Sequence, residues 1–306
     1  MDSGRRGDAD IVSCGHRFLE SPRWHRGVLY ASDFYERQVL RWHQDGSTEV
    51  ICEVPGEPSG LGWAATGELL VVSMTDRRLL RLDPGGELIE VADLWQYAPW
   101  HLNDMVVDRD GRAYIGNLGW DDETDERIAS TVLLRVDPGG AVSVAADDLV
   151  NPNGIAISAD GRTLLVSETF AARITAFDRA TDGELTNRRV WASFSERSFE
   201  TIPEALASGA LLPDGIALDS SGALWVGDCA GTGAARVAPG GRVLERVSTG
   251  DHTAFAVALG GPLNRTLFLC TAPPFRRVDH RRTREACMCS YLASTARLGD
   301  SGAARG

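Results

Sequence analysis

Oxygen-bearing side chains recur at one place in a repeated sequence pattern. Six stretches each end a loop and enter a strand-like run, and the shared position is occupied in turn by Glu20, Ser59, Asn103, Asn153, Asp214 and Thr253. The last five lie eight residues before a glycine that closes the next turn, and the glutamate lies seven residues before its glycine. A shared offset in repeated units predicts a shared place in space, so these side chains should converge on one axis.

Four of these residues, Glu20, Asn103, Asn153 and Asp214, have side chains that bind divalent cations. Two carboxylates that face one axis repel each other, and a bound cation removes that conflict. Hard oxygen ligands favour Ca²⁺, with Mg²⁺, Mn²⁺ or Zn²⁺ as alternatives. The competing interpretation is that Asn-Gly and Asp-Gly pairs are ordinary turn residues. A common register in four repeats weighs against it.

The segments between these positions predict short β-strands. Each aligned glycine is followed by a strand-like run, and further strands follow, separated by turns such as the Asp-Pro-Gly-Gly of residues 83–86. The aligned glycines are 40, 44, 50, 61 and 39 residues apart. Four strands in units of this length are typical of a propeller blade. We therefore predict an all-β, six-bladed β-propeller with four antiparallel strands per blade, and consider a β-sandwich the weaker alternative.

Closure of such a ring requires the two ends of the chain to share a blade. We expect a strand near residues 11–18 to pair with one within residues 288–298. The chain, 1–306, is then one propeller domain, ordered from about residue 10 to 298 and frayed at its termini. A short helix is expected at residues 202–208, in a long loop.

Aromatic residues gather in the loops predicted at the mouth, the end of the central channel where the inner strands begin. At least eight of the 22 aromatic residues fall there, which favours a ligand with apolar rings. The candidate substrate-binding residues are Phe34, Ser59, Trp100, His101 and Trp120.

Composition argues against several functions. A formal net charge of −12 provides no basic patch for nucleic acid. The sequence has no apolar run of about 18 residues and no apolar signal region at its start, so we expect no membrane association and a cytoplasmic location. The six cysteines are scattered, and we expect them to be reduced core residues. A small-molecule substrate is the expected partner.

Several motifs resemble those of a known family. Leu-Glu-Ser-Pro at residues 19–22, Leu-Asn-Asp at 102–104, Asn-Pro-Asn-Gly-Ile-Ala at 151–156 and Pro-Asp-Gly-Ile-Ala at 213–217 are similar to the family of senescence marker protein, gluconolactonase and luciferin-regenerating enzyme. The resemblance covers about residues 18–275. It implies a six-bladed propeller that hydrolyses lactones, with relatives that hydrolyse organophosphate esters. It also implies that Glu20, Asn153 and Asp214 bind one divalent cation directly, and that Asn103 contacts the substrate or metal-bound water.

One position departs from the family pattern. Its sugar-lactone hydrolases often have an arginine two residues before the asparagine, where this chain has His101. With the aromatic rim, this favours an apolar or aromatic lactone over a simple sugar lactone. His101 either binds substrate, acts as a base or packs at the rim.

In the expected mechanism the cation polarises the carbonyl, water attacks, Asp214 takes the proton of the water and Asn103 orients the substrate or the water. Two alternatives stay open. One is a non-hydrolytic cyclase or isomerase of secondary metabolism, and the other is a metal-stabilised binding propeller without turnover.

Overall fold

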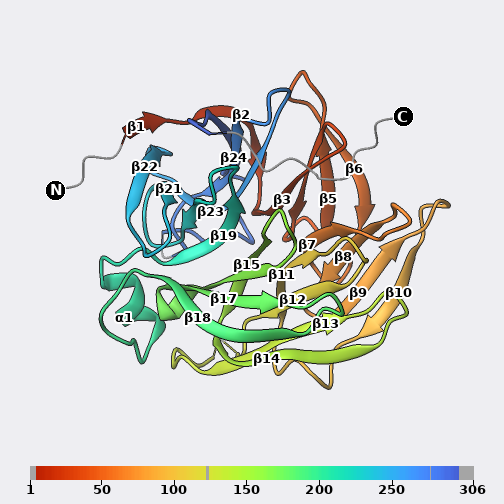
Figure 1. The fold of residues 1–306 in the computed structure, drawn as a ribbon. Helices are drawn as coiled ribbons and strands as arrows, with labels where there is room; N and C mark the ends of the chain where they lie inside the picture. Colours follow the sequence, from red (N-terminus) through yellow and green to blue (C-terminus); the bar gives the residue numbers. More distant parts are fainter. Residues whose placement is uncertain (1–4, 122–123, 276, 296–306) are drawn as a thin grey trace.

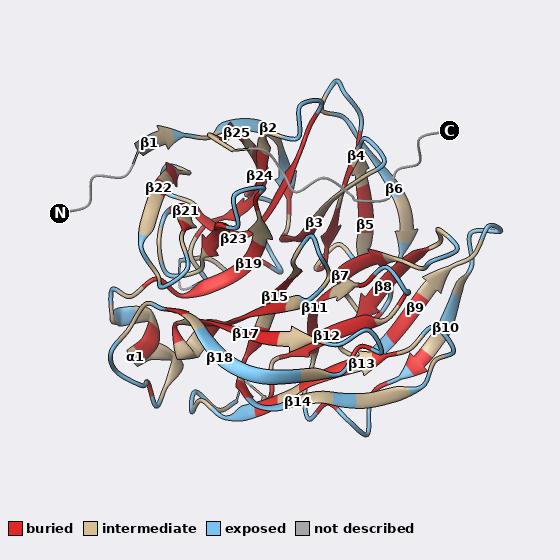
Figure 2. Ribbon diagram, viewed as in Figure 1, coloured by how far each residue is buried: buried red, intermediate tan, exposed pale blue. Residues whose placement is uncertain are grey.

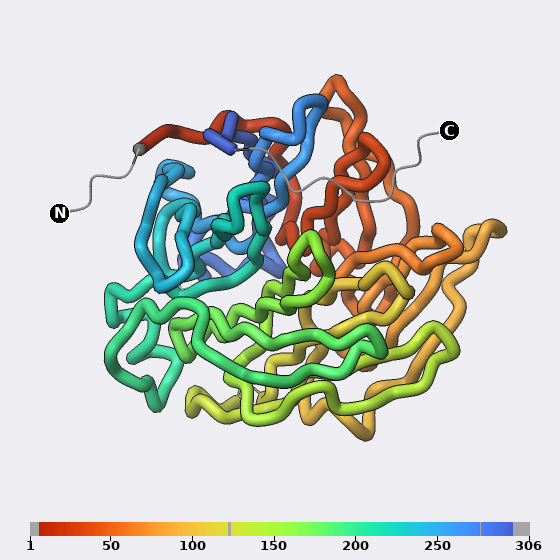
Figure 3. The backbone as a smooth tube through the Cα atoms, in the orientation of Figure 1, coloured from red at the N-terminus to blue at the C-terminus, as the bar shows by residue number. Residues whose placement is uncertain are grey.

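The computed structural model describes residues 5–121, 124–275 and 277–295. Its strands form six sheets in a ring, which confirms the predicted six-bladed β-propeller (Figure 1). The chain passes around the ring in sequence order (Figure 3). The predicted fraying of the termini falls largely on residues outside the described ranges.

Each blade has four antiparallel strands, and the first strand of each lies innermost (Figure 1). Blades 1 to 3 are β3 (Leu19–His25), β4 (Val28–Asp33), β5 (Gln38–Trp42) and β6 (Thr48–Glu53); β7 (Pro58–Trp63), β8 (Leu69–Ser73), β9 (Arg78–Leu82) and β10 (Leu88–Asp93); and β11 (Leu102–Val107), β12 (Ala113–Asn117), β13 (Ser130–Val136) and β14 (Val142–Val150). Blades 4 to 6 are β15 (Pro152–Ile157), β16 (Thr163–Glu168), β17 (Arg173–Arg179) and β18 (Leu185–Ser193); β19 (Pro213–Leu218), β20 (Leu224–Asp228), β21 (Gly233–Val237) and β22 (Val243–Ser248); and β23 (Thr253–Gly260), β24 (Thr266–Ala272), β25 (Ala286–Leu292) and β2 (Asp10–His16).

The N-terminal strand closes the ring, as predicted. β2 pairs antiparallel with β25, so both ends of the chain contribute to blade 6. One strand was not expected: β1 (Arg5–Asp8) pairs in parallel with β22 and adds a fifth strand to blade 5. Three charged residues and a glycine carry no periodicity that could predict a strand.

The two short helices lie in mouth loops. The predicted helix is confirmed as α1 (Ile202–Ala207), whose first turn is capped by Thr201 Oγ1 accepting from the backbone N–H of Glu204 at 3.3 Å. A single 3₁₀ turn, η1 (Thr169–Ala171), follows β16. Among the described residues, no helix has the length and hydropathy needed to cross a membrane.

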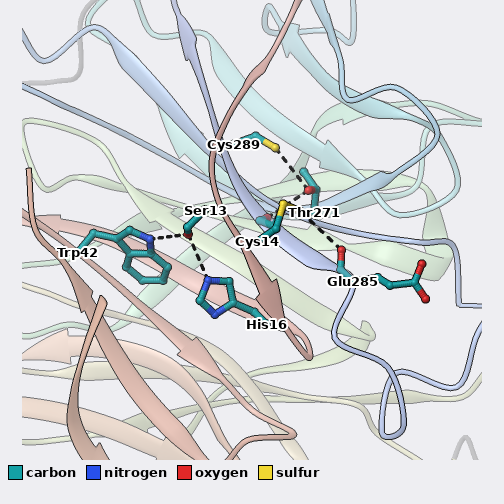
Figure 4. The surroundings of a disulfide bond; sticks show 8 residues. Ser13, Cys14, His16, Trp42, Thr271, Glu285 and Cys289 are labelled. Atoms are coloured by element: carbon teal, nitrogen blue, oxygen red, sulfur yellow. Dashed lines mark hydrogen bonds between the residues drawn. A yellow bond between two sulfur atoms is a disulfide. The ribbon is translucent and has the colours of Figure 1, made fainter. Parts of the chain in front are cut away.

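The prediction that all cysteines are reduced is wrong for two of them. Cys14 on β2 and Cys287 on β25 form a disulfide across a sequence separation of 273 residues (Figure 4). They are directly opposed in the pairing of the two strands, a proximity that only ring closure produces. The free cysteines in the described part of the chain are Cys52, Cys229, Cys270 and Cys289.

Hydrophobic packing between neighbouring blades holds the ring together. The buried residues follow the strands of every blade (Figure 2). Each interface has its own buried cluster; Val39 of blade 1, for example, packs with Leu61 and Val71 of blade 2. Equivalent clusters lie at the other five interfaces. A single blade could not bury both of its faces, so the ring is the stable unit that positions its inner strands.

The aligned glycines confirm the repeat. All six have positive φ, between 73° and 100°, in the turn between the first two strands of each blade. This backbone region disfavours residues with a Cβ. The glycines are Gly27, Gly67, Gly111, Gly161, Gly222 and Gly261.

Candidate metal and active site

The candidate ligands lie near the beginning of the inner strands, where every blade has a β-bulge. On β11 the pairing register shifts between Leu102 and Met105, which brackets Asn103 and Asp104. The other five inner strands shift at the corresponding place. A bulge places an extra residue on one strand and redirects its side chains. The repeated bulge therefore explains why one position per blade can face the channel.

The glycines that follow these ligands allow the strands to approach closely. A Cβ on Gly154, after Asn153, would lie 2.5 Å from the backbone oxygen of Asp214 on the next inner strand. A Cβ on Gly215 would lie 2.6 Å from the Cα of Ala256. Neither Asn153 nor Asp214 has positive φ, and both lie within strands. The interpretation of these pairs as ordinary turn residues is therefore wrong.

The strand pairing corrects one of the six repeated positions that were predicted to face the channel, called ring positions below. In the other blades the residue before the ring position pairs with the last residue of the second strand, as Pro213 does with Asp228. In blade 6 the last residue of the second strand is Ala272, and it pairs with Thr253 itself. Ala254 therefore occupies the ring position. Gly261 is the first residue of the turn between β23 and β24, whereas the aligned glycines of blades 2 to 5 are the fourth residue of their turns, so counting back from it misplaced the register by one residue.

The two predicted carboxylates are buried and act on each other electrostatically. Burial, and then the charge of Asp104, raises the pKa of Glu20 to about 8. Burial, followed by the charges of Glu20 and Asp104, raises the pKa of Asp214 well above its ordinary value. A hydrogen bond from the Asn153 side chain to the Asp214 carboxylate acts in the opposite direction. The structure thus brings together Glu20, Asn153 and Asp214 from blades 1, 4 and 5.

Some of the buried polar atoms without partners belong to predicted site residues. Asp214 Oδ1 and Asn103 Nδ2 are buried and have no hydrogen-bond partner within the described part of the chain. Among the same residues, the buried indole Nε1 atoms of Trp100 and Trp120 also lack one. Buried polar groups are usually paired, so an unpaired cluster calls for a ligand.

The chemistry of the donors fits a divalent cation. Two buried carboxylates with raised pKa values, an unpaired carboxylate oxygen and two amides would be satisfied by one hard dication. No group of three or more His, Cys, Asp or Glu side chains that could hold a metal occurs in the described ranges. A site made of two acids and two amides is consistent with that result.

Sequence reasoning missed Asp104 and Cys229 as neighbours of the site. Asp104 is 5% exposed, and its charge contributes to the raised pKa values of both Glu20 and Asp214. The signal that the sequence offered for Asp104 was its position directly after Asn103. Burial, and next the charge of Asp214, raises the pKa of the Cys229 thiol. Cys229 follows β20, and only the fold brings it near β19.

The five candidate substrate-binding residues occupy different environments. His101 stacks on Trp100, with ring centroids 4.5 Å apart, and the Trp120 ring lies 6.2 Å from that of Phe170. Phe34 is buried and packs against Phe18 at 4.9 Å. Ser59 is buried, and its backbone carbonyl accepts a hydrogen bond from Ser32 Oγ at 2.6 Å.

A cavity of about 980 Å³ opens at the opposite end of the channel. The far ends of the inner strands line it, including Arg23, His25 and Trp63. Its described lining includes none of the predicted ligands. The imidazole of His25 stacks on the Trp63 ring at 3.8 Å.

The fold and the candidate site together define a class of protein, a six-bladed propeller with acidic and amide side chains at one end of its central channel. Within that class, the chain belongs to the SMP-30/Gluconolactonase/LRE-like family, whose model matches residues 18–273. It is 29% identical over 265 residues to a 6-deoxy-6-sulfogluconolactonase of Pseudomonas putida, covering 85% of each protein. It is 27% identical to a pentonolactonase of Haloferax volcanii, covering 86% of this chain and 84% of that protein. The solved structure of the calcium-binding protein regucalcin from Agrobacterium tumefaciens superposes with a TM-score of 0.75 at 18% identity, covering 97% and 99% of the two chains.

Proposed function

We propose that this protein is a divalent-metal-dependent hydrolase that opens lactone rings. The observation that carries the proposal is the unpaired, buried Oδ1 of Asp214, beside Glu20 with its raised pKa. The names of the two similar lactonases support the reaction class, and the calcium-binding structural neighbour supports a cation.

Glu20, Asn153 and Asp214 would hold the cation, with Asn103 beside them. Ca²⁺ is the expected ion because all the donors are hard oxygens. When bound, the cation supplies a Lewis acid that polarises the lactone carbonyl and acidifies water. The two carboxylates balance its charge and lose their mutual repulsion.

The chain's own residues then orient the reactants and move the proton. The unpaired Nδ2 of Asn103 donates a hydrogen bond to the lactone carbonyl oxygen or to the attacking water. The Asp214 carboxylate accepts the proton of the water as its oxygen bonds to the carbonyl carbon. The ring C–O bond breaks, the ring oxygen leaves as a hydroxyl, and the product is a hydroxy acid.

The expected substrate is an apolar or aromatic lactone. His101, stacked on Trp100, stands where the family's sugar-lactone hydrolases often have an arginine. Trp120 and Phe170 add a second aromatic pair on the neighbouring blades. Aromatic faces pack against apolar rings more favourably than against polyhydroxylated ones.

The test is hydrolysis of sugar, aliphatic and aromatic lactones and an organophosphate ester by metal-stripped protein, with Ca²⁺, Mg²⁺, Mn²⁺ or Zn²⁺ restored singly. We expect turnover that requires the cation, is greatest on an apolar lactone, and falls at least about 100-fold in Asp214→Asn. Asp160→Asn is the matched control, because Asp160 lies in an exposed turn at the other end of a blade.

Each result distinguishes a different part of the proposal. Full activity of Asp214→Asn with the cation still bound would refute the base role. Preference for sugar lactones would refute the apolar substrate. Tight cation binding without turnover on any substrate would favour the non-hydrolytic or binding alternatives.

A further inference from the structure

An ion pair between a half-buried arginine and a buried aspartate lies next to the candidate cation site. Asp104 follows Asn103 on β11, and its Oδ1 accepts hydrogen bonds from Ser21 Oγ at 2.8 Å and the Met105 backbone N–H at 2.8 Å. Arg23 Nη2 donates to the same oxygen. The Asp104 and Arg23 side chains are 7% and 21% exposed. This carboxylate is thus held by blades 1 and 3 rather than by the ring residues.

Arg23 joins the inner strands of three blades. Its Nε donates to the Leu61 carbonyl of β7 at 3.1 Å, and its Nη2 donates to the Met105 carbonyl of β11 at 2.7 Å. Its Nη1 donates to the carbonyl of Pro22 on its own strand at 3.0 Å. Arg23 also lines the cavity at the far end of the channel. Its guanidinium therefore lies between that cavity and the carboxylates of Glu20, Asp104 and Asp214.

The net charge of this group would balance the charge of one dication. Glu20, Asp104 and Asp214 contribute −3 when ionised, and Arg23 contributes +1, which leaves −2. The next acid outward, Asp228, interacts with the charge of Arg246. A third carboxylate without the arginine would leave a net −3, and the arginine without Asp104 would place an unbalanced positive charge next to the cation.

We propose that Arg23 and Asp104 are a positioning pair that sets the charge and geometry of the cation site without binding the cation. Ser21 and Arg23 both donate to Asp104 Oδ1, so this oxygen is already engaged while the charge of the carboxylate still acts on Glu20 and Asp214. This inference rests on the proposed function, because it assumes that the ring binds a dication. Partners of this kind, one step removed from the metal, commonly change metal affinity 10- to 100-fold.

The test is a double-mutant cycle on Ca²⁺ affinity, measured by isothermal titration calorimetry on the full chain. Asp104→Asn should weaken binding roughly 10- to 100-fold, because Arg23 is then an unbalanced cation beside the metal. Arg23→Gln in that background should restore most of the affinity, since it removes the excess charge. Arg23→Lys, which keeps the charge, should bind with close to the wild-type affinity.

Melting temperatures in chelator separate this role from a purely structural one. The double variant has lost the most hydrogen bonds and should be the least stable apoprotein, yet it should bind Ca²⁺ more tightly than Asp104→Asn alone. A double variant that binds as weakly as Asp104→Asn, or more weakly, would overturn the inference and leave the proposed function intact. Wild-type protein that binds no divalent cation would overturn both.

Discussion

Removal of the cation should make the stability of this protein fall as pH rises. Burial and the charge of Asp104 raise the pKa of Glu20 from 4.5 to about 8. Between these values the folded state holds a proton that the unfolded chain has released, so the free energy of unfolding decreases with increasing pH. At about 1.36 kcal/mol per unit, Glu20 alone costs about 5 kcal/mol once pH exceeds 8.

The raised pKa of Asp214 acts in the same direction, so the metal-free protein should be markedly less stable at pH 8.5 than at pH 5. Urea unfolding in chelator across this range measures the effect, and Glu20→Gln is the reference because glutamine mimics the neutral acid. The stability of the wild type relative to this variant should fall by several kcal/mol. Saturating Ca²⁺ should abolish the trend, since the cation replaces the proton. Parallel pH profiles for wild type and Glu20→Gln in chelator would refute the reasoning.

Three further predictions concern ring closure, strand packing and proton linkage. Reduction of the Cys14–Cys287 disulfide should destabilise the fold by up to about 5 kcal/mol, because the bond closes a loop of nearly the whole chain; an unchanged melting temperature in reductant would contradict this. Gly154→Ala should cost about 1–3 kcal/mol, since its Cβ would lie 2.5 Å from a backbone oxygen, whereas Gly139→Ala, whose Cβ has no described neighbour within 4 Å, should change the free energy of unfolding by less than about 0.5 kcal/mol. Equal denaturant midpoints for the two variants would argue against tight strand packing at the site. Cation binding at pH 6.5 should release about one proton or more, chiefly from Glu20, which calorimetry in buffers of different ionisation enthalpy would detect; binding heats that are independent of the buffer would contradict it.

The sequence by itself determined the repeat, the four strands that every blade shares and most of the positions that face the channel. These features are local: a turn glycine with positive φ and four short strands recur in each unit, and five of the six units have an oxygen-bearing residue at the same position. Identical units that close a ring place equivalent residues around one axis, so the positions of Glu20, Asn103, Asn153 and Asp214 followed from counting. The count failed for Thr253, because Gly261 begins its turn whereas the glycines of blades 2 to 5 are the fourth residue of theirs, so the offset from it does not report the strand register.

Only the tertiary structure decided which residues from distant blades meet. The disulfide joins residues 273 positions apart, and Arg23 meets Asp104 across 81 positions; neither separation leaves a periodic signal. The raised pKa of Glu20 also depends on burial and on a charge from another blade, which no local pattern encodes. The sequence therefore specified the kinds of candidate ligand and their register. Burial and contacts between blades decided their ionisation and the ion pair next to them, because both depend on groups far apart in the chain.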